Sequence, residues 1–466
     1  MTDGAPAVLI RGAALALATD GEGRQQLDGP TADILVESGK ISRLSTAVCL
    51  DAGGASVIEA QGLVALPGFI DLYARLREPG PGGHGNLASE SAAALGAGFS
   101  HVLCAPDTTP VIDNTATLEL ILHRADAAGG ARILPIAALT QGLEGQTLSE
   151  LATLQRGGCV AAGQADRAVE DAGVLFSALQ YAHGFGLPLI MTPRDARLGA
   201  DGCAHDGAVA TRLGLPGIPV VAETIALARL LELVRESGCR LHVSRVSSAR
   251  AVELIADARA DGLPVTADVG IHHLFFTEDE IAGYDARYRA AVPFRSVDDR
   301  TALRNALCSG VIDAICSDHA PLDRDSRLAP FPACTPGLSA YDHFLELLLA
   351  LPALLERPFA ELLPSVTSAP ATLIKLNGAD SRHTLGEGSA ADLMLIDPTA
   401  TDDEAAPRLS AGRNTPLDGV DNLRECTGEH APLGGRVRHA MVAGVITTLA
   451  DTSSRPALHE IPQRHE

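Results

Sequence analysis

Short apolar runs alternate with helical patterns between residues 67 and 374, and this regularity restricts the possible folds more than any other property of the chain. The apolar runs are FIDL, HVLCAP, ILPIAAL, CVAAG, PLIMT, RLHVSRV, PVTADV and IDAICSDHAP. Longer helical patterns separate them, including AETIALARLLELVRESG and SARAVELIADARADG. Strand–helix alternation repeated about eight times predicts an α/β fold with a (β/α)8 barrel of the TIM type.

Both ends of the chain carry β-rich patterns outside this alternation. Residues 7–66 contain AVLIRGAAL, ADILVESGKISRL and SVIEAQGLV, and the C-terminal region contains GSAADLMLIDP and RVRHAMVAGVITTLA. We therefore expect a composite, β-sandwich-like domain of residues 1–66 and 375–466 that flanks a barrel of residues 67–374. The polar segment 399–435 is expected to be a loop.

Composition limits the classes of partner. The chain has 36 Lys and Arg against 58 Asp and Glu, a formal net charge of −22, which argues against nucleic acid or an anionic membrane. The apolar stretch 344–363 is interrupted by Glu346, Pro352, Glu356 and Arg357, which favours globular helices over a membrane span. The N-terminus lacks a signal-peptide pattern. The nine cysteines contain no C-x-x-C, so we expect a cytoplasmic protein without a disulfide framework.

Polar residues at the ends of the expected strands are the candidates for function, because a barrel of this type builds its site where strands run into the following loops. These residues are Asp71, Tyr73, Arg75, Arg77, Asp107, Gln164, Asp166, Thr192, Arg194, His242, Arg245, His272, His273, Asp318 and His319.

Eight short motifs follow one another along the chain in a characteristic order. They are PGFIDLYARLREPG (67–80), APDTTPVID (105–113), LHVSRVSS (241–248), VTADVGIHHLFFTEDE (265–280), VPFR (292–295), SDHAP (317–321), GEGSAADLMLIDP (386–398) and RNTPLDG (413–419). In order and spacing the chain resembles the dihydroorotases of the amidohydrolase superfamily over nearly its full length. The resemblance implies the barrel fold and, in active members, zinc held at the mouth.

The positions that the resemblance assigns to metal ligands have mostly changed. Histidines of the family are replaced by Tyr73, Arg75, Thr192 and Arg245. Gln164 and Ala165 fall at the acidic positions of the bridging ligand, although a one-residue slip of the alignment brings in Asp166. Only Asp318, in the family both ligand and catalytic base, is retained.

Substrate contacts implied by the resemblance are also altered. Arg77 is kept, whereas Asp107 and Ala291 replace asparagines and Leu322 replaces a histidine. We leave two alternatives for Arg77: it holds an anion, or it braces a loop with Asp107.

The lost ligands bear directly on chemistry. Opening a cyclic amide at neutral pH requires a hydroxide, which a bound metal supplies by lowering the pKa of its water from 15.7 towards about 7. Arginine offers only hydrogen-bond donors and stays protonated, so it cannot ligate a cation. We therefore expect no metal, no cofactor and no catalytic residue.

The retained groups receive structural interpretations. Asp318 is expected to be a vestigial base paired with Arg75 or Arg245, since a buried charge needs a partner. We hypothesise that these two arginines replace the metal's positive charge. His242, His272 and His273 are interpreted as core histidines, and His319 as hydrogen-bonded near its strand end.

The resemblance implies a function without catalysis, because dihydroorotase-like subunits that lack the ligands associate with aspartate transcarbamoylase. We expect an inactive partner of that enzyme's catalytic chain, in a hetero-oligomer of pyrimidine biosynthesis. Two alternatives stay open. One is an active cyclic amidohydrolase with an altered metal site around Asp166, His242 and Asp318. The other is a regulatory subunit that binds a metabolite through Arg75, Arg77 and Arg245.

Overall fold

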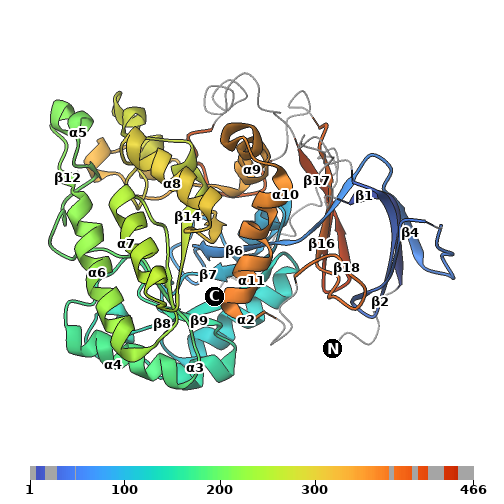
Figure 1. Cartoon of the computed structure of the whole chain (residues 1–466), viewed down its shortest axis with the longest axis horizontal. Helices are drawn as coiled ribbons and strands as arrows, with labels where there is room; N and C mark the ends of the chain where they lie inside the picture. The colour runs from blue at the N-terminus through green and yellow to red at the C-terminus, as the bar shows by residue number, and fades with distance from the viewer. Residues whose placement is uncertain are drawn as a thin grey trace, which may run out of the picture.

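The structure is a computed structural model that describes residues 7–15, 29–47, 49–376, 383–400, 408–417 and 435–449. A barrel ringed by helices lies beside a separate sheet formed by the two chain ends (Figure 1). The predicted α/β barrel with a flanking β module is confirmed.

Eight parallel strands form the barrel wall, in the sequential order in which the chain supplies them. They are β6 (Phe69–Ala74), β7 (Phe99–Cys104), β8 (Arg132–Ala138), β9 (Ala161–Gly163), β10 (Leu189–Met191), β13 (Leu241–Val243), β14 (Val265–Gly270) and β15 (Ala314–Cys316). The ring closes between β15 and β6. His319, beyond β15, forms a β-bridge with Ala74 of β6, and its backbone carbonyl accepts a hydrogen bond from the Arg75 amide at 2.8 Å. The carboxyl ends of all eight strands therefore face one mouth.

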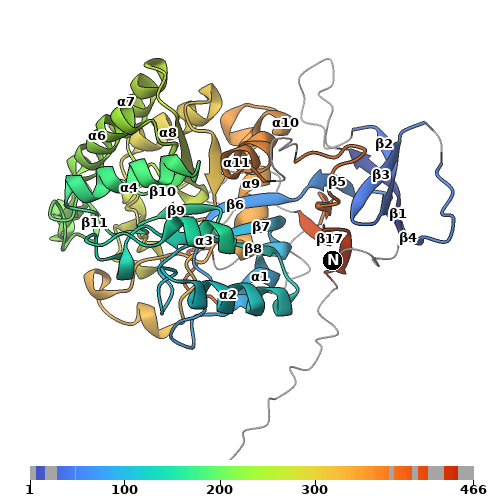
Figure 2. The same cartoon turned by 90° about the horizontal axis from the view of Figure 1, so that it is seen from below.

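Helices cover the outside of the barrel (Figures 1 and 2). They are α1 (Leu87–Gly96), α2 (Thr115–Ala128), α3 (Leu151–Gly157), α4 (Ala172–Gly184), α6 (Val220–Ser237), α7 (Ala249–Ala260), α8 (Val297–Ser309), α9 (Tyr341–Leu355), α10 (Phe359–Leu362) and α11 (Ser368–Ile374). Several begin at a residue whose side chain accepts a hydrogen bond from the first turn, as Asn86, Asn114, Asp171, Ser248 and Ser296 do. Such caps satisfy otherwise unpaired amides and define the helix starts.

Two insertions stand above the mouth. Between β10 and α6 lie β11 (Ala204–His205), α5 (Ala208–Leu213) and β12 (Gly217–Ile218), and β11 pairs with β12. Between β14 and α8 lie three 3-10 turns, at Ile271–Leu274, Glu278–Ile281 and Ala286–Tyr288. These segments supply additional side chains to the rim.

The chain ends build one mixed sheet. Its strands are β18 (Val445–Thr448), β17 (Arg436–Val442), β16 (Leu393–Asp397), β5 (Val64–Pro67), β1 (Val8–Leu15), β2 (Thr31–Glu37) and β3 (Lys40–Ser45), and β4 (Ser56–Glu59) pairs with β1. The sheet joins sequence-distant ends where β16 pairs antiparallel with β5. The expected domain boundaries, near residues 66 and 375, stay a prediction. Of the expected loop 399–435, only residues 399–400, 408–417 and 435 are described, and they lie outside any helix or strand.

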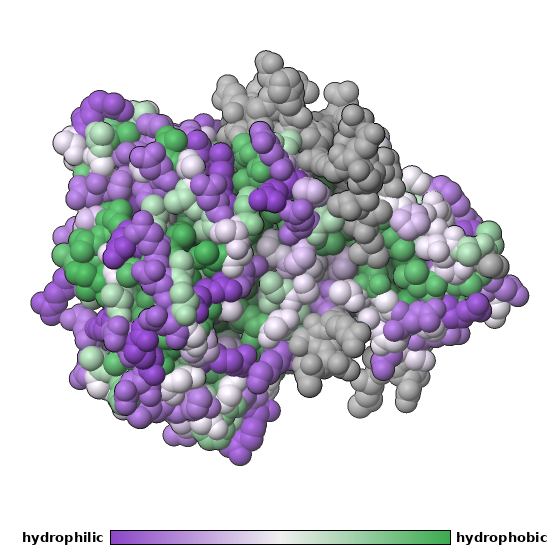
Figure 3. Space-filling view, viewed as in Figure 1, coloured by the Kyte–Doolittle hydropathy of each residue, from purple (hydrophilic) through white to green (hydrophobic). Residues whose placement is uncertain are grey.

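Apolar side chains fill the space between the layers. One large cluster lies between the barrel strands and the surrounding helices, and a second lines the terminal sheet through residues such as Ile10, Ile34 and Leu395. No helix among the described residues is long and apolar enough to cross a membrane. Figure 3 shows hydrophilic and apolar residues interspersed on the face turned to the viewer. Exposed apolar residues of the structure include Val221 and Ile225 of α6.

Candidate functional site

Polar side chains from the strand ends meet at the mouth of the barrel. We call these residues the mouth network: Tyr73, Arg75, Asp107, Asp166, Thr192, Arg245 and Asp318. All were candidates from the sequence. The short distance from each strand end to its polar residue explains why they converge, since parallel strands in a closed barrel end at the same edge.

Asp166 links the two arginines of the mouth network. Its Oδ2 accepts a hydrogen bond from Arg75 Nη2 at 2.5 Å, and its Oδ1 accepts one from Arg245 Nη2. Burial acts to raise the pKa of Asp166, but the guanidinium charges of Arg245 and Arg75 outweigh it and hold that pKa well below the usual range. The carboxylate is therefore ionised and shared between two cations.

Arg245 is the most enclosed of these groups, with 1% of the residue exposed. Its Nη1 donates to Asp318 Oδ1 at 2.9 Å, and its Nη2 also donates to Thr192 Oγ1 at 2.6 Å. Its Cζ lies 3.9 Å from the centre of the Tyr73 ring. Arg245 thus joins side chains from four different strand ends in one set of charge-assisted contacts.

Arg75 completes the network on the other side. Its Nε donates to Asp107 Oδ2 at 2.8 Å, and its Nη2 donates to the Tyr73 hydroxyl at 3.2 Å. Arg75 is 8% exposed. Two buried guanidiniums are therefore neutralised by three carboxylates, as buried charges require.

Of the two partners expected for Asp318, the structure gives Arg245. Burial raises the pKa of Asp318 above its usual value, despite the lowering effects of Arg245 and Arg75. Its backbone adopts a φ of 48°, and Arg245 a φ of 58°. Residues other than glycine seldom adopt this left-handed region, so the backbone at both strand ends is held in an uncommon conformation.

The choice between Gln164 and Asp166 has a structural answer. Gln164 is fully buried and exchanges hydrogen bonds with Thr140, through Oε1 at 3.1 Å and Nε2 at 2.9 Å. Asp166, two residues later, is the side chain that enters the mouth network. The acidic group at this strand end is Asp166.

The histidines interpreted as core residues are buried. His242 bonds Thr266 Oγ1 through Nδ1 at 2.9 Å and Asp268 Oδ2 through Nε2 at 2.7 Å. Burial lowers the pKa of His272 to about 3 and that of His273 to about 4, so both rings are neutral. His242 uses both ring nitrogens in these bonds, which leaves none to ligate a metal at the mouth.

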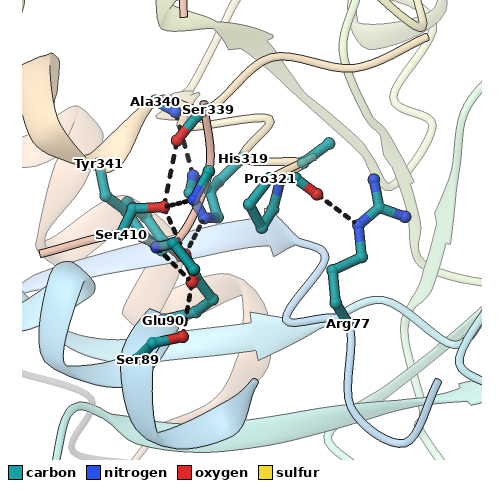
Figure 4. Close-up of polar contacts among 12 residues, drawn as sticks. Arg77, Ser89, Glu90, His319, Pro321, Ser339, Ala340, Tyr341 and Ser410 are labelled. Atoms are coloured by element: carbon teal, nitrogen blue, oxygen red, sulfur yellow. Dashed lines mark hydrogen bonds and ion pairs between the residues drawn. The ribbon is translucent and has the colours of Figure 1, made fainter. Parts of the chain in front are cut away.

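His319 lies in a buried polar cluster beneath the loop after β15. Its Nε2 is 2.8 Å from Glu90 Oε2, and its Nδ1 accepts a hydrogen bond from the Ala340 amide at 3.0 Å. Glu90 also accepts from Ser410 Oγ at 2.7 Å and from the Ala411 amide at 3.0 Å (Figure 4). The cluster attaches segment 408–417 to α1 and to the barrel. Glu90 and Ser410 were missed from sequence, because nothing marks Glu90 as buried within the pattern SESAAALGAG.

Arg77 does not pair with Asp107, whose carboxylate bonds Arg75 instead. The Nε of Arg77 donates to the Pro321 carbonyl at 2.9 Å, and its two terminal nitrogens point away from the His319 cluster (Figure 4). Burial, and then the charge of Arg75, lower the pKa of Arg77 to about 10. The guanidinium therefore stays charged, and it contacts the loop after β15 through Nε.

The zinc implied by the resemblance does not fit this donor set. Two of the positions hold guanidiniums that carry only donors. Burial raises the pKa of Tyr73 well above its usual value, so its hydroxyl stays protonated. Within the described part of the chain, no group of three or more His, Cys, Asp or Glu side chains is placed to hold a metal ion.

Comparison with known proteins agrees with the fold and the motifs. Residues 62–251 match the family model described as Dihydro-orotase-like. Two curated relatives named dihydroorotase-like protein, from Pseudomonas putida and Pseudomonas aeruginosa, are each 41% identical to this chain. The alignments span 414 and 417 residues, which are 88% and 89% of this chain and 93% and 94% of the relatives.

A further relative is named dihydroorotase, and a solved structure shares the fold at low sequence identity. A protein named dihydroorotase from Anaeromyxobacter dehalogenans is 39% identical over 412 residues, 87% of this chain and 93% of its own. The solved structure of an L-hydantoinase (dihydropyrimidinase) from Arthrobacter aurescens matches with a TM-score of 0.77 and 22% identity, over 95% of this chain and 97% of its own. At that identity the likeness concerns the fold alone.

Proposed function

We propose that this chain, which belongs to the dihydroorotase-like family of the amidohydrolase superfamily, is a non-catalytic, cytoplasmic partner of the aspartate transcarbamoylase catalytic chain. In this proposal the transcarbamoylase carries out the chemistry of pyrimidine biosynthesis. The present chain supports the assembly or activity of that enzyme within a hetero-oligomer.

The observation that carries the non-catalytic part is the pair of guanidiniums in the mouth network. Arg75 and Arg245 stand at positions where the family has histidine ligands, and both are ion-paired to Asp166. Asp318, which in the family acts as base, is bonded to Arg245. Among the described residues, no group of three or more His, Cys, Asp or Glu side chains is placed to hold the metal that would generate the hydroxide this reaction needs.

The partnership is supported by the resemblance together with this loss of chemistry. The chain keeps the barrel and the terminal sheet, whereas ion pairs fill its mouth. This combination supports a role that depends on the fold and not on catalysis. Two relatives of similar length are named dihydroorotase-like proteins, which accords with a role that follows the fold.

The non-catalytic part is tested by metal analysis and a dihydroorotase assay on the purified protein. We expect no stoichiometric zinc and no turnover in either direction, with or without added zinc. The Anaeromyxobacter dehalogenans protein named dihydroorotase, 39% identical to this chain, is a matched comparison prepared in the same way. Stoichiometric zinc with turnover in the present chain would overturn the proposal and restore the hydrolase alternative.

The partnership is tested by co-expression with the transcarbamoylase catalytic chain of the same organism. We expect this chain and the transcarbamoylase catalytic chain to co-elute in size-exclusion chromatography. Expressed alone, the catalytic chain should be less active or fail to assemble. Separate elution together with full activity of the lone catalytic chain would reject this part.

One observation favours a second role, that of a metabolite-binding subunit. Arg77 bonds the Pro321 carbonyl and forms no ion pair with a carboxylate of the mouth network, whose Asp107 bonds Arg75. Arg75 and Arg245, which the sequence suggested for this role, are already neutralised by carboxylates. Any anion would therefore have to bind elsewhere on the rim.

A further inference from the structure

The segments inserted above the mouth enclose a groove of about 730 Å³. It is lined by Arg327 and by residues 213–215, 284–287 and 329–332, and no residue of the mouth network lines it. The Tyr284 hydroxyl donates to the Leu213 carbonyl at 2.7 Å, so two of the lining segments are bonded to each other. Residues 213–215 end α5, which lies at the end of the molecule remote from the terminal sheet (Figure 1). The groove is therefore separate from the mouth network.

The floor of the groove is apolar and well packed. Phe331 and Leu215 line the groove but are themselves buried, in a cluster with Val209 and Ile281. Pro330 and Pro332 flank Phe331 in sequence, and each ring fixes the φ angle of its own residue. The groove is thus a preformed apolar recess, which can receive a side chain without first being reorganised.

Leu328 projects from the wall of this groove. Its neighbours in sequence, Arg327 and Ala329, line the groove, whereas Leu328 is 78% exposed, more than any other large apolar residue that the structure describes. Tyr284, in another wall, is 49% exposed. Exposed apolar side chains gathered in one place are typical of a contact surface. The same small area therefore offers both a protruding apolar side chain and a recess for one.

Charges of both signs lie beside Leu328. Arg324 and Asp325 are exposed. Arg327 donates to the carbonyls of Thr335, at 2.9 Å, and Gly337. Among the described residues neither Asp325 nor Arg327 forms an ion pair, and the buried Nε of Arg327 has no partner. Asp325 and Arg327 can therefore serve as opposite charges in a contact with another molecule.

These features favour a second copy of this chain over other occupants of the groove. In a two-fold contact both copies use the same surface, so that surface must carry a protrusion, a recess and charges of both signs. The segment 325–332 meets all of these conditions. Because the formal net charge is −22, two copies repel each other in general. Contact is then favoured where the local charges balance, as they do here.

We propose that this groove is the interface of a two-fold symmetric dimer of this chain. Leu328 of each copy enters the groove of the other copy, and Asp325 of each copy faces the partner's Arg327. A few apolar anchors seated in preformed pockets supply most of the binding energy in contacts of this kind. The inference does not depend on the partnership with aspartate transcarbamoylase, because it concerns contacts between copies of this chain alone.

The first test measures the mass of the full chain by size-exclusion chromatography with light scattering, over about two decades of protein concentration. We expect a dimer. Leu328→Glu should raise the dissociation constant of the dimer about a hundredfold or more, because it places a charge in an apolar groove at two equivalent contacts. Leu328 is exposed, so the variant should fold, which circular dichroism checks. Val445→Glu is the matched control, because Val445 is 62% exposed on β18 of the terminal sheet.

A second variant tests the pairing of side chain and groove. Ala329 is exposed and lines the groove, so Ala329→Arg should fill the recess and also give a monomer. An equimolar mixture of the two variants should form dimers again. In the mixed dimer an unaltered Leu328 enters an unaltered groove at one contact, and the introduced carboxylate and guanidinium meet at the other.

Three outcomes would overturn the proposal. One is a monomer at every concentration. Another is a dimer that Leu328→Glu and Val445→Glu weaken equally, which would place the interface elsewhere. The third is a monomer whose co-elution with the transcarbamoylase catalytic chain is lost in Leu328→Glu, which would make that chain the occupant of the groove. Two monomeric variants whose mixture stays monomeric would reject the insertion of Leu328 into the groove.

Discussion

The guanidinium of Arg245 lies over the ring of Tyr73, with Cζ 3.9 Å from the ring centroid. The resemblance gives histidine ligands at both positions, which in active relatives would reach an ion lying between them. Here the two side chains contact each other directly, and a cation over an aromatic face is favourable when it is shielded from water. Contacts between protein side chains therefore hold the mouth network together. The following predictions rest on these contacts.

Removing Arg245 should destabilise the fold. Arg245→Met leaves Asp166 and Asp318 without one shared cation, and breaking a buried ion pair typically costs about 3–5 kcal/mol. Arg245→Lys keeps the charge but loses the planar fork, so an intermediate loss is expected. Urea denaturation measures the free energy of unfolding of both variants. Arg250→Met, at an exposed pair with Glu253, should change stability by less than about 1 kcal/mol. Equal effects at 245 and 250 would contradict the structural role.

Asp166→Asn should destabilise the protein in a pH-dependent way. The folded-state pKa of Asp166 is lowered from the ordinary value of 3.8 by Arg245 and Arg75, against the effect of burial. A lowered pKa contributes stability above the unfolded value that is lost as the pH falls below it. We expect a loss of about 2–3 kcal/mol at pH 7 that shrinks below about pH 4. Asp201→Asn, at an exposed site, is the control, and a difference independent of pH would reject this assignment.

Asp318→Ala should destabilise the fold, but less than Asp166→Asn does. Burial raises the pKa of Asp318. Its ionised form therefore costs folding free energy once the pH is above this raised pKa, and this cost offsets part of the stabilisation from its bond to Arg245. We expect a loss of about 1–2 kcal/mol at pH 7, read from urea denaturation. An unchanged free energy of unfolding would mean that Asp318 has no structural role in the mouth.

Chelation should leave the protein unaffected. Because guanidiniums fill two ligand positions and the described residues offer no group of metal-binding side chains, EDTA should not shift the melting temperature. A metal that bound the folded state would stabilise it, and its removal would lower the transition. A drop on chelation that is reversed by added zinc would show that a metal site exists.

Glu90→Gln should loosen segment 408–417. Glu90 is fully buried, and its bonds to His319 and Ser410, working against burial, hold its pKa below the usual value. Losing the charge weakens these contacts by about 1.5–3 kcal/mol. Hydrogen exchange at the amide of Ala411 should accelerate, whereas Glu119→Gln on the exposed face of α2 should leave it unchanged. Unaltered exchange in Glu90→Gln would show that the segment is held by other contacts.

The barrel and the terminal sheet follow from the amino-acid pattern alone. Strand–helix alternation has few solutions other than a closed parallel barrel, and the β patterns at both chain ends pair once β16 meets β5. The same pattern places Tyr73, Arg75, Arg245 and Asp318 at a common mouth, because each lies at the end of a strand or just after it.

The pairing of charges, in contrast, depends on the three-dimensional arrangement. The sequence left Gln164 and Asp166 as alternatives, and it left open whether Arg77 holds an anion or braces a loop with Asp107. In the structure Gln164 bonds Thr140, and both Asp107 and Asp166 bond Arg75. A long side chain reaches several partners from one backbone position, so spacing along the chain does not fix its contacts.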